Sequence, residues 1–183
     1  MPIKGPATGS VLGRIAAMGL RTLDGATQVA NLCGSFLISG LVFLIGADVF
    51  SRNAFNAPIS GVPEMVTLSI VAIVFLQAPQ ALKAGRMTRS EAVIGVLARR
   101  APRVLVVVET LYDLLGALVV GAILAATWPI FTRAWTRSEF VGAAGDFTAP
   151  VWPVKLMILV GCGLLVLQFL ARIARRFQNG VAV

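Results

Sequence analysis

The chain has 183 residues, of which 57% are apolar and only 13% are charged, with a mean hydropathy of +0.87 and a net charge of +8. A soluble domain carries about 25% charged residues, so lipid must be part of this chain's solvent. The basic residues lie between the apolar runs, which indicates loops beside a membrane and excludes a nucleic-acid-binding face. There is no histidine, which excludes histidine acid–base catalysis, histidine metal ligands and Ser–His or Cys–His nucleophiles.

Four apolar runs are long enough to cross a hydrocarbon core, which takes about 20 helical residues. They cover approximately residues 29–47, 62–82, 104–130 and 150–173. Because no backbone crosses lipid with unpaired polar groups, each run is predicted to be a helix. The sequence therefore predicts an all-α membrane protein with four transmembrane helices in a single membrane domain, residues 1–183.

Two further segments have the composition of helices that lie on the membrane. Val11–Asn31 mixes apolar residues with two arginines and is interpreted either as such an interfacial amphipathic helix or as a short solvated leader, with Asp24 as a turn residue before the first span. After the second run, Thr88 and Glu91 have the spacing of a capping box. They open an apolar face that predicts an interfacial helix over approximately residues 89–101.

The positions of Lys and Arg predict the orientation. Twelve of the 16 fall in the N-terminal segment, the loop between the second and third runs, and the C-terminal tail. By the positive-inside rule, both termini face the cytoplasm. Trp128, Trp135 and Trp152 all fall on the opposite side, as an interfacial aromatic belt would.

The outer loop between the first two runs is rich in charged and turn-forming residues. Asp48 and Arg52 have the i, i+4 spacing of a helix-surface ion pair, and Glu64 in the first turn of the next helix complements its dipole. A salt link from Arg52 to Glu64 or to Asp48 would fix the hairpin at the membrane surface. We call the following set the outer clasp: Asp48, Arg52, Asn56, Pro58, Gly61 and Glu64.

The third run contains two carboxylates and a row of small residues. Glu109 and Asp113 share one helix face, and acids within a membrane span are functional candidates. A proton or cation pathway is one interpretation. We favour a second interpretation, in which the acids are protonated or are hydrogen-bonded to a neighbouring helix or subunit, because the runs supply no Lys or Arg away from their ends. Ala117, Gly121 and Ala125 recur every four residues, which lets another backbone approach closely.

No motif of a membrane enzyme is present in the sequence. It has no glycine-rich phosphate loop of the GxxxxGK[ST] kind and no G-x-S-x-G elbow. The sequence therefore predicts no catalytic residue and no metal-ligand set, and the protein is not expected to be an enzyme.

The outer clasp resembles the corresponding stretch in the small membrane subunit of TRAP transporters, the DctQ-like family. An acid, an arginine, an aromatic-Asn-x-Pro turn, a glycine and a glutamate stand here as Asp48, Arg52, Phe55-Asn56-Ala57-Pro58, Gly61 and Glu64. The entry to the last run, Pro150-Val151-Trp152-Pro153, and the number of spans are also similar. The chain departs from the family's cytoplasmic G-x-H loop, because Met87 stands where the histidine would be.

The resemblance implies a non-catalytic scaffold in the cytoplasmic membrane of a bacterium or archaeon. The implied partners are a large multi-helix permease subunit, a periplasmic substrate-binding protein and membrane lipids. No cofactor is expected on this chain, since the resemblance places the sodium ions and the organic acid on the large subunit. The alternatives are a stand-alone small cation- or proton-coupled transporter and a structural subunit of another membrane complex.

Overall fold

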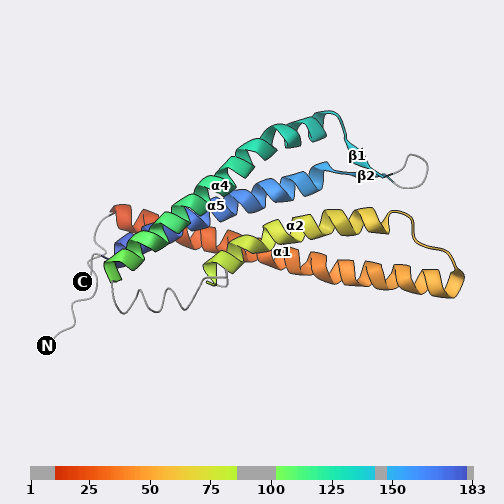
Figure 1. Cartoon of the computed structure of the whole chain (residues 1–183), viewed down its shortest axis with the longest axis horizontal. Coiled ribbons are helices and arrows are strands. Elements are labelled where there is room, and N and C mark those ends of the chain that lie inside the picture. The colour runs from red at the N-terminus through yellow and green to blue at the C-terminus, as the bar shows by residue number, and fades with distance from the viewer. Residues whose placement is uncertain (1–10, 86–101, 143–147, 181–183) are drawn as a thin grey trace.

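The computed structural model describes the backbone of residues 11–85, 102–142 and 148–180. Within these ranges the chain forms four long helices and one short two-stranded ribbon (Figure 1). The helices are α1 (Val11–Phe55), α2 (Val62–Lys83), α4 (Pro102–Thr136) and α5 (Trp152–Gly180). All four are long and apolar enough to cross a membrane, which confirms the all-α membrane fold. The interfacial helix predicted over residues 89–101 lies outside the described residues.

The first helix differs most from the prediction. α1 is one continuous helix of 45 residues from Val11 to Phe55, so the segment before the predicted span is not a separate interfacial helix. Asp24 lies inside this helix and is not a turn residue. Its carboxylate is accommodated there because Lys83 and Arg175, from two other helices, reach it.

The third span also runs further than predicted. α4 continues through Pro129 to Thr136. Pro129 lacks the N–H that would bond to the Ala125 carbonyl, and a proline inside a membrane helix is tolerated where side chains, waters and neighbouring helices satisfy the freed group. Beyond α4, β1 (Phe140–Val141) pairs antiparallel with β2 (Ala149–Pro150) and leads into α5.

The helices are arranged as two antiparallel pairs joined through α5. α5 packs along α4 and also along α2, while α1 packs mainly on α2 (Figure 1). The core combines Leu82 of α2, Ala117 of α4, and Leu165 and Phe169 of α5. Toward the end that carries the β1–β2 ribbon, the α1–α2 pair and the α4–α5 pair diverge in the view of Figure 1.

Two glycines permit the closest helix contacts. A Cβ on Gly161 would lie 2.3 Å from the Phe75 carbonyl oxygen, so α5 can lie against the backbone of α2 only with glycine at that position. A Cβ on Gly116 would lie 2.7 Å from Cζ of Phe169. Contacts of this kind are typical of membrane helices, where packing replaces the hydrophobic effect as the driving force.

Candidate functional site

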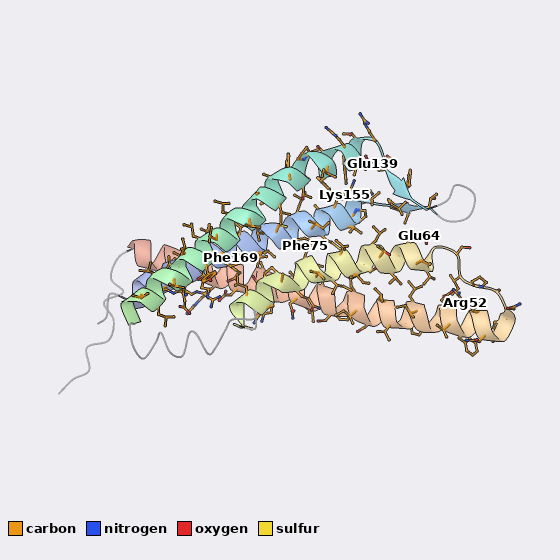
Figure 2. The ribbon with its side chains drawn as sticks, viewed as in Figure 1. Arg52, Glu64, Phe75, Glu139, Lys155 and Phe169 are labelled. Carbon is orange, nitrogen blue, oxygen red and sulfur yellow. The ribbon has the colours of Figure 1, made fainter. Side chains whose placement is uncertain are left out.

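The two ends of the bundle hold the polar residues that the sequence singled out. Figure 2 shows Arg52 and Glu64 at the tip of the α1–α2 pair, and Glu139 and Lys155 at the corresponding tip of the α4–α5 pair. We call this end the outer end and the opposite end the inner end, following the predicted orientation.

Asp48 is the centre of the outer clasp. Its side chain is nearly buried, at 7% exposure for the residue. Arg52 Nη2 donates to its Oδ2 at 2.9 Å, and the Ile59 backbone N–H donates to its Oδ1 at 2.9 Å. One carboxylate therefore joins the last turns of α1 to the loop that leads into α2.

The backbone of the clasp turns at two left-handed positions. Asn56 has φ 53° directly after α1, and Gly61 has φ 82° directly before α2. Asparagine and glycine tolerate this conformation best. Pro58 lies exposed in the loop between them, and the Ser51 hydroxyl donates to the Ala57 carbonyl at 2.7 Å.

Glu64 takes a different position from Asp48. It is half-buried in the first turn of α2, where a carboxylate is favoured by the helix dipole. Among the described residues, the ion pair of Arg52 is with Asp48 and Glu64 forms none. Of the two salt links that the sequence left open, the structure contains the local one.

At the inner end, Glu109 and Asp113 lie among arginines of α5. Arg176 Nη2 lies 2.9 Å from Glu109 Oε2 and 3.3 Å from Asp113 Oδ2, and Arg172 Nε lies 3.7 Å from Asp113 Oδ2. Asp113 is 1% exposed. The inference that these acids lack basic partners is wrong, because the antiparallel packing of α4 and α5 brings the start of α4 beside the end of α5.

A second group of contacts ties α1 to α2 and α5. Arg175 Nη2 lies 2.9 Å from Asp24 Oδ1, and Lys83 Nζ lies 3.4 Å from Asp24 Oδ2. The Gln168 amide donates to the Thr27 hydroxyl at 2.8 Å in a fully buried contact. We call the two groups together the inner charge network, formed by Asp24, Thr27, Lys83, Glu109, Asp113, Gln168, Arg172, Arg175 and Arg176.

The predicted small-residue row on α4 is only partly used within the chain. Ala117 is buried in the core against α5. A Cβ on Gly121 would meet nothing within 4 Å, and Ala125 is exposed. The close approaches that the row predicted are made instead at Gly116 and Gly161.

The outer end of the α4–α5 pair is fixed by a second ion pair. Lys155 Nζ donates to Glu139 Oε2 at 2.6 Å, and the rings of Trp135 and Trp152 meet edge to face at 4.9 Å. The hydrogen bond from Lys155 lowers the pKa of Glu139 from its ordinary 4.5. Among the described residues, no group of three or more Asp, Glu or Cys side chains is placed to hold a metal ion.

Sequence reasoning missed the members of the inner charge network on α1 and α5. The sequence pattern predicts a turn at Asp24, and it identifies the arginines near the end of α5 only as charges that orient the chain. Their spacing gave one signal: Gln168, Arg172, Arg175 and Arg176 recur at intervals of four, three and one, which places polar groups along one side of a helix.

Residues 41–179 match the family model described as "Tripartite ATP-independent periplasmic transporters, DctQ component". No significant similarity was found to a curated protein or to a solved structure.

Proposed function

The chain belongs to the DctQ-component family of tripartite ATP-independent periplasmic (TRAP) transporters, and from this premise we propose that it scaffolds the large permease subunit of a sodium-coupled importer of organic acids. The family indicates the small membrane subunit of a TRAP transporter, and it is a family of transport components and not of enzymes. The scaffolding role, the sodium coupling and the class of substrate are the parts we propose.

The scaffolding role is supported by the way the acids of the bundle pair with basic residues of other helices. Every acid of the inner charge network faces an arginine or lysine of a different helix: Asp24 faces α2 and α5, and Glu109 and Asp113 face α5. Charges paired in this way hold helices in register. An ion pathway needs carboxylates that face a wet cavity and exchange partners.

The orientation and the location of the chain are inferred from the distribution of its basic residues. At the inner end, Lys83 at the end of α2 lies beside Asp24 of α1, and Arg176 near the end of α5 lies beside Glu109 near the start of α4. In the sequence, twelve of the 16 Lys and Arg belong to the N-terminal segment, the loop between the second and third spans and the C-terminal tail. With four spans, the positive-inside rule assigns this end to the cytoplasm, which supports a place in the cytoplasmic membrane with both termini inside. The outer clasp and the β1–β2 ribbon would then face the periplasm.

The partners and the ion-binding subunit are inferred from the family. We propose that the chain binds a large multi-helix permease and that a periplasmic binding protein delivers the substrate, as in the transporters that give the family its description. Sodium would bind the permease, and this chain would need no cofactor.

The test is purification of the chain, tagged at its C-terminus, from its native membrane in mild detergent. The proposal expects a large polytopic protein in near-equal amount, and transport in vesicles that needs both chains, sodium and the soluble binding protein. Recovery of the chain alone as a homo-oligomer, with uptake by that species, would contradict it and support a stand-alone transporter. In that case the inner charge network would be the first place to look for the pathway.

A further inference from the structure

One face of α1, made mostly of small and polar residues, is not covered by α2, α4 or α5. Successive members are three or four residues apart, which places them in one line along the helix. We call this line the α1 stripe; its members are Gln28, Asn31, Ser35, Ser39, Val42, Gly46, Val49 and Asn53. All are exposed except Asn31, which is half-buried. The side of α1 that packs on α2 and α5 is a different one, with Thr27, Ala30 and Asp48 buried there.

The exposed surfaces of the other helices have the composition that lipid requires. From Leu114 to Ala126, every exposed residue of α4 is apolar. Thr67 is the single exposed polar residue of α2 between Pro63 and Val74. Polar groups therefore gather on one exposed face of one spanning helix.

The side chains of the stripe are adapted to protein more than to lipid. The Ser35 and Ser39 hydroxyls donate to the carbonyls of Asn31 and Ser35, at 3.0 and 3.2 Å, which leaves their oxygens as acceptors on the surface. The side-chain amides of Gln28 and Asn31 have no hydrogen-bond partner in the described part of the chain. An amide without a partner is costly in hydrocarbon and is satisfied by a neighbouring helix.

Gly46, within the stripe, is a further sign of a close neighbour. A Cβ at this position would meet nothing within 4 Å in the described part of the chain, so no described contact requires glycine there. Glycine in a helix interior costs about 1 kcal/mol relative to alanine. In membrane helices such a residue lets another backbone approach closely.

We infer that the α1 stripe is the surface on which a membrane-spanning helix of the large permease subunit packs, through small residues and hydrogen bonds. From Gln28 to Asn53 the stripe is about 38 Å long at 1.5 Å per residue, enough to follow one helix across a hydrocarbon core of about 30 Å. The inference rests on the proposed function. It assigns the face to the permease and not to a second copy, because the family is one component of a multi-part transporter.

Photo-crosslinking from two matched positions tests the assignment. A photoactivatable phenylalanine analogue is placed at Ser39 on the stripe, or at Ala122, a small exposed residue in the middle of α4. The tagged full-length chain is expressed in its native host and irradiated in the membrane. The inference expects crosslinks to the permease from residue 39 and none from residue 122. Crosslinks from residue 39 to a second copy or to lipid alone would overturn it, as would permease crosslinks from residue 122 alone.

Leucine substitutions provide the quantitative test. Ser39→Leu and Gly46→Leu enlarge exposed positions of the stripe, where a Cβ at residue 46 meets nothing within 4 Å, and Ala122→Leu and Ala126→Leu enlarge exposed positions of α4. We expect the stripe variants to lower the permease recovered with the chain by roughly tenfold, and the α4 variants to change it by less than about twofold. The reverse order, or equal effects, would overturn the inference. If the unsubstituted chain brings down no permease, the proposed function itself fails, and that result is distinct from a stable complex that uses another face.

Discussion

Gly161 of α5 lies against the backbone of Phe75 in α2, so closely that a Cβ on the glycine would stand 2.3 Å from the Phe75 carbonyl oxygen and 2.6 Å from its carbon (Figure 2 labels Phe75). The obstruction is main chain, which cannot rotate away as a side chain can. The contact joins the two helix pairs, because α5 belongs to one pair and α2 to the other.

We therefore expect Gly161→Ala to force α2 and α5 apart and to destabilise the fold by roughly 1–3 kcal/mol, the usual cost of overpacking. Thermal unfolding of the purified chain in detergent measures the loss. Gly163→Ala is the matched control, since a Cβ there meets nothing within 4 Å and alanine favours the helix by about 1 kcal/mol. Equal unfolding temperatures for the two variants would contradict the role of the contact.

The buried acid of the inner charge network gives the second prediction. Asp113→Asn leaves Arg172 and Arg176 beside a neutral side chain in a site where the Asp113 side chain is 2% exposed. Loss of one partner from a buried ion pair costs roughly 3 kcal/mol or more, so we expect poor recovery of folded chain. Glu109→Gln should cost less, since the Glu109 side chain is 22% exposed and Arg176 retains Asp113.

The same pair of variants separates structure from ion transport. If Asp113→Asn assembles normally with its permease and abolishes the sodium dependence of uptake, the acid belongs to a pathway and its structural role is refuted. Both measurements are made on one preparation in vesicles.

The outer clasp gives the third prediction. Asp48→Ala removes the acceptor for both Arg52 and the Ile59 N–H, and each of these part-buried hydrogen bonds contributes about 0.5–1.5 kcal/mol of net stability. Arg52→Ala removes only the ion pair, and the Arg52 side chain is 59% exposed, so about 0–1 kcal/mol is expected. Unfolding temperatures of the two variants should therefore fall in the order wild type, Arg52→Ala, Asp48→Ala. A larger loss for Arg52→Ala than for Asp48→Ala would contradict the central position of Asp48 in the clasp.

The fourth prediction concerns pH at the outer end. Lys155 lowers the pKa of Glu139 below its ordinary 4.5, so the ionised form is favoured by folding. The stabilisation is present above pH 4.5 and is lost as the pH falls through the lowered pKa of the folded state. Unfolding temperatures measured from about pH 7 to about pH 3 should decline less steeply for Glu139→Gln than for wild type. Parallel curves would show that the Glu139–Lys155 pair contributes nothing measurable.

Much of the membrane topology follows from composition. The apolar runs predict four spans because hydrocarbon accepts only internally bonded helices, and the second helix, Val62–Lys83, agrees with the predicted run to one residue. Gly61 and Pro63 fix its start through local chemistry, which a single sequence reveals.

The interhelical contacts could not be predicted in the same way. Asp24 looks like a helix breaker until Lys83 and Arg175, 59 and 151 residues away, are known to surround it. Glycines at 116, 121, 161 and 163 are equivalent in the sequence, and only the neighbouring helix decides which of them tolerate a side chain. Such pairings depend on tertiary geometry, whereas the sequence pattern reports only which face of a helix each residue occupies.

The length of α1 has a consequence for the surrounding bilayer. Its 45 residues extend about 67 Å, more than twice the thickness of a hydrocarbon core. Met18 and Phe55, near its two ends, are both largely exposed, so a helix standing along the membrane normal would hold them in water. Part of α1 therefore lies beyond the hydrocarbon core even at a tilt of about 40°, and how far each end projects depends on the tilt and on the thickness of the lipid. A thinner membrane would lower the outer clasp toward the headgroups, which makes the height of this end a property of the lipid as well as of the protein.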